Sequence, residues 1–171
     1  MLPERAFRRN ILLGLALFLG APGCRTGLQD GVFAKPGVRY TVGPLPQGFQ
    51  PVRLRDNDVA FTSDPADVSV AVNSTCEGYD DASLDVLTHQ LLMGFTDVQK
   101  VDQRTEPLDG REALRTRVRA KLDGVPQELL FVVMKKNGCI FDLTYLGRPD
   151  AFEKGLSAFQ ALLARFHVEE P

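Results

Sequence analysis

The sequence has few of the residues that catalytic and metal sites use most. Of its 171 residues, two are histidines, three are cysteines and none is tryptophan. His89 and His167 lie far from each other and from any cysteine at zinc-ligand spacing, and the aspartates lack the spacing of a calcium loop. No nucleophile elbow, P-loop or dinucleotide-binding glycine motif is present. The sequence therefore predicts no catalytic residue, no metal and no cofactor, and we expect a protein that is not an enzyme.

Long apolar runs are also missing, except at the N-terminus. Residues 11–19 are apolar, follow three arginines and precede small residues that end at Cys24, which is the layout of a secretory signal. This run is about half of the roughly 20 residues that a membrane-spanning helix needs. Removal of residues 1–23, which hold three arginines and one glutamate, changes the formal net charge from −2 to −4. An acidic exported chain is a poor candidate for binding nucleic acid.

The end of this leader resembles that of bacterial lipoprotein precursors. The residues "APGC", Ala21 to Cys24, stand where these precursors carry a lipobox before the cysteine, although the family usually has Leu in place of Ala21. The resemblance implies a signal peptide over 1–23 and a lipid, such as palmitate, on Cys24. It also implies an anchor in the cell envelope, with the periplasmic side of the outer membrane favoured. Ordinary cleavage nearby, which would leave Cys24 as a thiol, is the alternative.

The remaining chain divides into a tether and one domain. Residues 24–37 have loop composition without periodicity and predict a flexible tether, whereas residues 38–171 have the size of a single domain with one core. Cys76 and Cys139 are the two cysteines left in this domain. In an oxidising compartment they are expected to form a disulfide, and two buried thiols are the alternative.

Residues 111–146 predict a three-stranded antiparallel meander. Asp-Gly at 123–124 and Asn-Gly at 137–138 are two-residue hairpin turns, which fix the register of the strands that they join. This register places Arg117 opposite Leu130 and Asp142 opposite Val133. Asp142 then lies on an apolar face, where a carboxylate needs a partner or has a raised pKa. Proximity of Asp142 to water or to a basic residue at the end of the sheet is the alternative.

The middle strand of this meander, "LLFVVM", is apolar on both faces and needs cover on both. Apolar residues repeat at helical spacing near 84–95 and again in "PDAFEKGLSAFQALLARF", so two helices are predicted. Short strands are predicted between 38 and 75, and a polar edge strand over 96–108. The predicted fold class is α+β, an antiparallel sheet with helices packed on both faces.

This order of elements over roughly 38–168 resembles the PsbP-like family of α/β/α sandwiches, which includes many bacterial lipoproteins. No catalytic motif carries the resemblance. It implies a non-enzymatic binding or assembly protein, because most members of the family have such roles. A shared fold alone does not define a function.

A basic stripe runs along one predicted strand, where every second residue is a cation: Arg115, Arg117, Arg119 and Lys121. Such residues can lie as a solvated face, with Arg119 opposite Glu128, or they can contact an anionic lipid or an acidic partner. From these features we expect an envelope lipoprotein that is held in the membrane by its N-terminal lipid and binds a protein partner. The alternative is a module that binds a lipid or small ligand on the apolar and basic sheet face.

Overall fold

A computed structural model describes residues 27–44, 47–55, 57–78 and 81–170. The predicted leader and Cys24 lie outside the described residues. Within the described part of the chain, no helix is long and apolar enough to cross a membrane.

The domain begins with a hairpin in the segment that was predicted to be a tether. Strands β1 (Gly27–Gln29) and β2 (Val32–Lys35) pair in antiparallel fashion, and the turn between them is Asp30-Gly31, with φ values of 50° and 79°. Phe33 on β2 is buried at 3% exposure. The prediction of a flexible tether over 24–37 is therefore wrong from Gly27 onward, because this turn and a buried aromatic side chain hold the segment in the fold.

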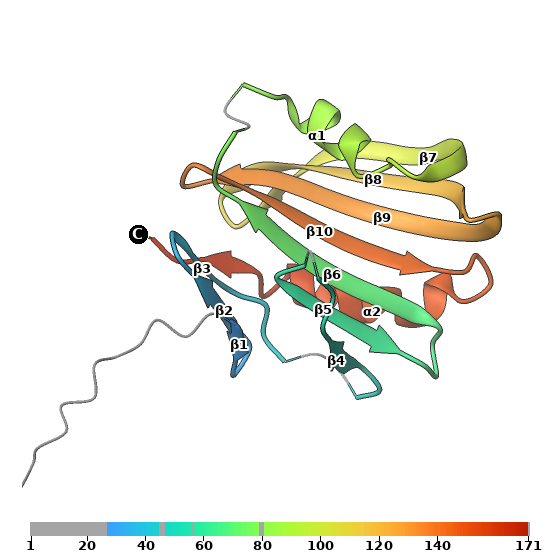
Figure 1. Ribbon diagram of the computed structural model, residues 1–171, viewed down its shortest axis with the longest axis horizontal. Coiled ribbons are helices and arrows are strands. Elements are labelled where there is room, and N and C mark those ends of the chain that lie inside the picture. The colour runs from blue at the N-terminus through green and yellow to red at the C-terminus, as the bar shows by residue number, and fades with distance from the viewer. Residues whose placement is uncertain (1–26, 45–46, 56, 79–80, 171) are drawn as a thin grey trace, which may run out of the picture.

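This hairpin belongs to a four-stranded sheet. Strand β3 (Val38–Thr41) pairs with β2 on one side and with the C-terminal strand β11 (His167–Val168) on the other, in the order β1-β2-β3-β11. Figure 1 shows this sheet beside the main sheet, close to the C-terminus.

The main sheet has seven antiparallel strands. In chain order these are β4 (Gln50–Val52), β5 (Val59–Ser63), β6 (Val68–Thr75), β7 (Phe95–Leu108), β8 (Arg111–Leu122), β9 (Val125–Lys136) and β10 (Cys139–Gly147). Their order in the sheet is β4-β5-β6-β10-β9-β8-β7, so β4 and β7 form opposite edges. The polar strand predicted at an edge is β7, and shifts of register interrupt its pairing with β8 at two places.

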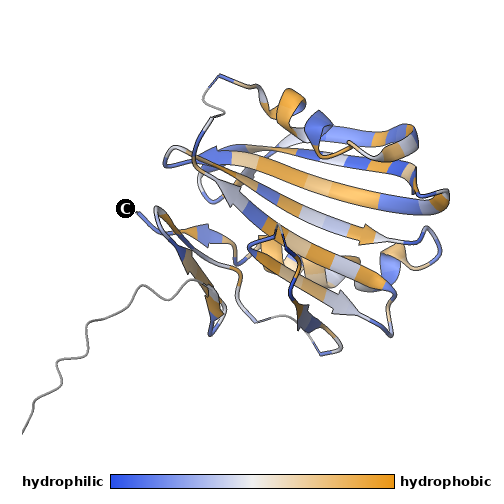
Figure 2. Cartoon of the chain, in the orientation of Figure 1, coloured by the Kyte–Doolittle hydropathy of each residue, from blue (hydrophilic) through white to orange (hydrophobic). Residues whose placement is uncertain are grey.

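The predicted meander is confirmed, including its register. Arg117 pairs with Leu130, and Asp142 pairs with Val133. The turns at 123–124 and 137–138 hold all four residues at positive φ, as hairpin turns of this type require. Figure 2 shows apolar residues along the central part of β9, the middle strand of the meander, with hydrophilic residues toward its two ends.

One face of the main sheet carries the larger core. Helix α2 (Phe152–Leu163) buries Phe152 and Phe159 against this face, where Tyr145 stacks on Phe159 with 5.5 Å between ring centroids. The four-stranded sheet covers the rest through Phe33 and Tyr40. Gly155 permits the close approach of α2, because a Cβ atom there would lie 2.8 Å from the hydroxyl oxygen of Tyr145.

A smaller core lies on the opposite face of the main sheet and contains the side chains that alternate along the strands with those of the larger core. Helix α1 (Leu84–Gln90) contributes Leu87, which packs with Val118, Phe131 and Val133. This helix contacts β8 and β9. It has seven residues and is therefore shorter than the helix that the apolar spacing near 84–95 predicted. The described chain is thus mainly β, with two sheets and two helices. The predicted α+β sheet with helices packed on both faces is only partly met, because a second sheet shares the larger core with α2 and α1 is a short helix on the other face.

Candidate functional site

The basic stripe of β8 is paired with carboxylates along its whole length. Each of its cations has a partner oxygen at 2.6–3.6 Å: Arg115 with Glu106, Arg117 with Glu128 and Glu153, Arg119 with Glu128, and Lys121 with Asp97. The positive charge is therefore largely neutralised within the protein. These internal ion pairs argue against a site for anions, although only Arg119 and Lys121 of the stripe are solvated and Arg115 and Arg117 are largely covered.

Arg117 is the centre of this arrangement. Its guanidinium lies 4.5 Å from the ring centroid of Phe152 and contacts the carboxylates of Glu128 on β9 and Glu153 on α2. Burial alone would lower the pKa of Arg117, but the hydrogen bonds that its guanidinium donates to these two carboxylates raise it. The side chain of Glu128 is 2% exposed, so this ion pair lies under α2. At Arg117, the apolar and basic sheet face that was proposed above as a ligand site is covered by the start of α2, whereas Arg119 and Lys121 remain exposed.

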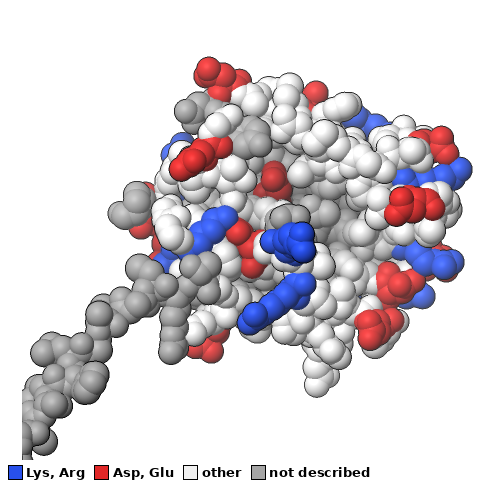
Figure 3. Space-filling view, viewed as in Figure 1, with Lys and Arg blue, Asp and Glu red and all other residues white. Residues whose placement is uncertain are grey.

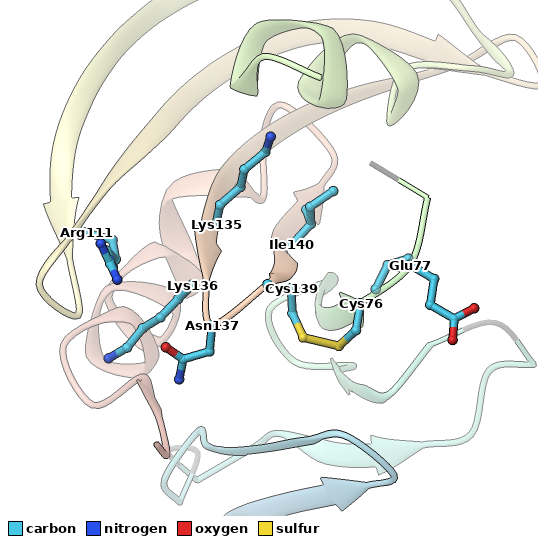
Figure 4. Close-up of a pocket in the computed structure, with 10 residues that line it drawn as sticks. Cys76, Glu77, Arg111, Lys135, Lys136, Asn137, Cys139 and Ile140 are labelled. Carbon is cyan, nitrogen blue, oxygen red and sulfur yellow. A yellow bond between two sulfur atoms is a disulfide. The ribbon is translucent and has the colours of Figure 1, made fainter. Parts of the chain in front are cut away.

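The two domain cysteines are joined, as predicted. Cys76 follows β6, Cys139 begins β10, and a disulfide links them with Cα atoms 4.0 Å apart. Figure 4 shows the pocket beside this bond, which has a volume of ≈ 300 Å³ and includes Arg111, Lys135 and Lys136 among its lining residues. Lys135 and Lys136 point to opposite sides of β9. The pocket is basic but does not gather its charge at one point.

Lys136 forms an ion pair with Asp109, a residue that was not identified as important from the sequence. Its ammonium lies 2.9 Å from Asp109 Oδ2, and Asp109 also contacts His167 Nδ1 at 2.8 Å and accepts a hydrogen bond from the Val168 backbone. Burial would raise the pKa of Asp109, but the hydrogen bonds from Lys136, Val168 and His167 lower it. The Asp-Gly turn at 109–110 was visible in the sequence, whereas its contact with β11 depends on the tertiary fold.

A second network joins the two sheets. Asp58 accepts hydrogen bonds from Lys35 at 2.7 Å, from the Tyr40 hydroxyl at 3.3 Å and from the Ser74 backbone at 2.8 Å. Desolvation raises the pKa of Tyr40, and the nearby Asp58 carboxylate raises it further. The sequence alone does not reveal this role of Asp58, because its partners come from strands that are distant in the sequence.

The groove between α1 and β7 is an open surface with a largely apolar lining. It has a volume of ≈ 480 Å³, and its apolar lining includes Leu92, Met93, Phe95, Val98 and Val118. Met93 is 78% exposed and Val98 is 42% exposed. Exposed apolar side chains gathered around a groove are typical of a surface that binds another molecule.

The polar residues of this groove form a chain of hydrogen bonds across its floor. Gln103 Nε2 on β7 donates to Asp85 Oδ1 on α1 at 3.1 Å and to Thr116 Oγ1 on β8 at 3.0 Å, while Lys100 Nζ donates to Gln103 Oε1 at 2.6 Å. His89, which was predicted to be exposed, is exposed at the edge of the groove. The groove thus offers apolar contacts together with a few oriented polar groups, which is the usual composition of a binding surface.

Asp142 lies on the face of the sheet that α1 partly covers. Burial raises its pKa from 3.8 to about 6. Among the described residues, no group of three or more His, Cys, Asp or Glu side chains could hold a metal ion. Among the described residues, Asp142 is therefore a half-buried titratable carboxylate that does not belong to a cluster of potential metal ligands.

Comparison with solved structures identifies the fold. The domain superposes on CyanoP, the cyanobacterial PsbP of Synechocystis sp. PCC 6803, with a TM-score of 0.56 and 17% identity over 92% of this chain and 99% of that one. It also superposes on LpqN of Mycobacterium tuberculosis, described as involved in cell envelope biogenesis, with a TM-score of 0.56 and 15% identity over 74% of this chain and 82% of that one. The chain has a PsbP-like fold.

A third similar structure is a protein of unknown function from Pseudomonas aeruginosa, with a TM-score of 0.52 and 14% identity over 82% of this chain and 96% of that one. No family model and no curated protein matches the sequence. At these identities the comparisons establish the fold alone.

Proposed function

We propose that this protein is a membrane-anchored lipoprotein of the bacterial cell envelope that binds a protein partner and carries out no catalysis of its own. The groove between α1 and β7 would hold the partner. Its exposed apolar residues, Met93 and Val98, are the single observation that carries this proposal.

The groove suits a protein partner better than a small ligand. It is open to solvent along the edge strand β7, on which Val101 is also 47% exposed. The register shifts in β7 protect this edge from pairing with a further strand. Binding is therefore expected through side chains that enter the groove, with the hydrogen-bonded Gln103 and Asp85 beneath them.

The anchor rests on the leader and on Cys24. The layout of residues 1–24 supports export and lipidation, and the disulfide between Cys76 and Cys139 suits an oxidising compartment. LpqN, which shares the fold, is described as involved in cell envelope biogenesis, and this supports a location in the cell envelope. Within this proposal the domain is a PsbP-like α/β/α sandwich in which α1 forms a thin outer layer.

Crosslinking in cells tests the partner. A photoreactive amino acid at Met93 should crosslink to one defined protein, whereas the same group at Lys154, which is exposed on α2, should not. Val98→Lys should abolish the crosslink without loss of folded protein, because Val98 is already exposed. Equal crosslinking from positions 93 and 154, or recovery of this protein alone, would contradict the proposal.

The anchor is tested separately. Metabolic labelling with palmitate should mark the wild-type protein, and Cys24→Ala should remove both the label and the association with membranes. A Cys24→Ala protein that still carries lipid would exclude lipidation at this cysteine.

A further inference from the structure

The hairpin β1–β2 leaves almost no chain between the domain and the proposed lipid. Only Arg25 and Thr26 separate Cys24 from Gly27, the first residue of β1. An extended chain spans about 3.3–3.6 Å per residue, so Gly27 can lie no more than roughly 10 Å from Cys24. A lipid on Cys24 would therefore hold the surface around Gly27 directly against the bilayer.

The residues around Gly27 have the chemistry of a membrane-facing surface. Gly27 and Leu28 line the same cavity as Arg53 and Leu54, which follow β4. Leu54 is 53% exposed, although it is a large apolar side chain. Figure 3 shows Lys and Arg side chains gathered on this side of the molecule, next to the point where the described chain begins.

The two arginines beside Leu54 differ from those of the basic stripe. Arg53 and Arg55 are exposed, and neither forms an ion pair with another described residue, whereas every cation of the stripe has a carboxylate partner. Asp56, which follows Arg55 in the sequence, lies outside the described residues. An exposed leucine between two arginines can insert its side chain at the boundary of the acyl chains while the guanidinium groups contact phosphates.

We propose that this surface, formed by Leu28, Arg53, Leu54 and Arg55, rests on an anionic phospholipid bilayer. The proposal rests on the proposed lipid anchor at Cys24. The protein without its leader has a formal net charge of −4, so overall electrostatics oppose contact with an anionic membrane and the attraction must be local. Each arginine near such a surface contributes an attraction that corresponds to roughly fivefold in affinity.

This orientation also places the α1–β7 groove away from the membrane. Strands β4 and β7 are opposite edges of the seven-stranded sheet. With about 4.8 Å between neighbouring strands, these edges lie roughly 30 Å apart. The lipid would thus set the direction in which the groove faces.

The absence of tryptophan makes the orientation measurable. Leu54→Trp introduces a single fluorophore at an exposed position. The full lipidated protein is placed on vesicles of phosphatidylcholine and phosphatidylglycerol whose acyl chains carry bromine, which quenches tryptophan in contact with them. We expect emission to fall at least about twofold, because an apolar side chain at the interface enters the acyl boundary. Val101→Trp on β7 is the matched control and should remain unquenched.

Charge variants test the role of the arginines. In the Leu54→Trp protein, Arg53→Gln with Arg55→Gln should reduce the quenching, and vesicles of phosphatidylcholine alone should have the same effect. Arg111→Gln with Lys154→Gln removes two other exposed cations and should leave the quenching unchanged. Equal effects of the two pairs would overturn the local attraction.

The outcomes also separate this proposal from the anchor. If the protein sediments with vesicles through a lipid on Cys24 but position 54 is not quenched, or is quenched no more than position 101, the docking surface is wrong and the anchor stands. If the wild-type protein carries no lipid at Cys24, the anchor is wrong and the docking proposal is overturned with it, because the short link to the bilayer is lost.

Discussion

Lys35 of the four-stranded sheet and Asp58, which directly precedes strand β5 of the seven-stranded sheet, form an ion pair of 2.7 Å, and the same ammonium donates a hydrogen bond to the Ser74 carbonyl oxygen on β6, also at 2.7 Å. The Asp58 side chain is 11% exposed. The two sheets are therefore joined by a polar contact as well as by their shared apolar core. Loss of this contact should therefore lower the free energy of unfolding of the whole domain.

Asp58→Asn should lower the free energy of unfolding by about 2–3 kcal/mol, because it leaves the partly buried Lys35 ammonium without its counter-charge. Urea denaturation monitored by circular dichroism measures the change. Asp67→Asn is the matched control, since Asp67 is 68% exposed and lies 3.9 Å from its nearest cation. The control should change stability by less than about 0.5 kcal/mol. Similar losses in both variants would refute a special role for Asp58.

Glu128→Gln should cost about 3 kcal/mol, because the buried carboxylate serves both Arg117 and Arg119. Glu106→Gln changes a glutamate on β7 that pairs with Arg115 of the same stripe. This side chain is 27% exposed, and the change should cost less than about 1 kcal/mol. Denaturation of both variants under one condition gives the comparison. If the two losses are equal, Glu128 does not act as a buried partner.

Asp142→Asn should stabilise the protein at pH 7. The folded-state pKa of Asp142 is raised from 3.8 to about 6, so its contribution to stability is lost as the pH rises between these two values and stays lost above them. At pH 7 the carboxylate then costs up to about 3 kcal/mol, which the asparagine removes. Unfolding of wild type and variant should agree near pH 4 and diverge toward pH 7. A variant that is less stable than wild type at pH 7 would show that the ionised carboxylate has a favourable role.

Cys76→Ser with Cys139→Ser should lower stability by about 4 kcal/mol, the loss of loop-closure entropy expected for a bond across 63 residues. Reduction of the wild type should have a comparable effect. Mass spectrometry of unreduced peptides from the native protein should recover Cys76 joined to Cys139. Recovery of both as free thiols would exclude the bond in the cell.

The parts of the fold that the sequence predicts are those fixed by neighbouring residues. The turns at 123–124 and 137–138 set the register of three long strands without any knowledge of the rest of the chain. An Asp-Gly pair also forms the β1–β2 turn at Asp30-Gly31, but the loop-like composition of the residues around it led to the prediction of a tether. The four-stranded sheet was not predictable in this way, because β3 pairs with β11 across more than a hundred residues.

The candidate site shows the same division. The alternation of basic residues on β8 is visible in the sequence, but their carboxylate partners lie on β7, β9 and α2. Only the tertiary structure reveals that these partners neutralise the stripe. Arg53 and Arg55, which form no ion pair with another described residue, have no periodic pattern, and their proposed role depends on the nearby start of β1.

The pairing of β3 with β11 constrains the order in which the strands can pair while the chain is synthesised from its N-terminus. The strands β1, β2 and β3 appear first, but β3 keeps one open edge until His167 and Val168 arrive to pair with Thr41 and Tyr40. The local hairpins of the main sheet can form during this interval, since they join neighbouring segments. Chains that stop short of residue 168 would keep an open strand edge, which is a surface that promotes aggregation and recognition by proteases. The β3–β11 pairing therefore closes a strand edge that a chain truncated before His167 would leave open.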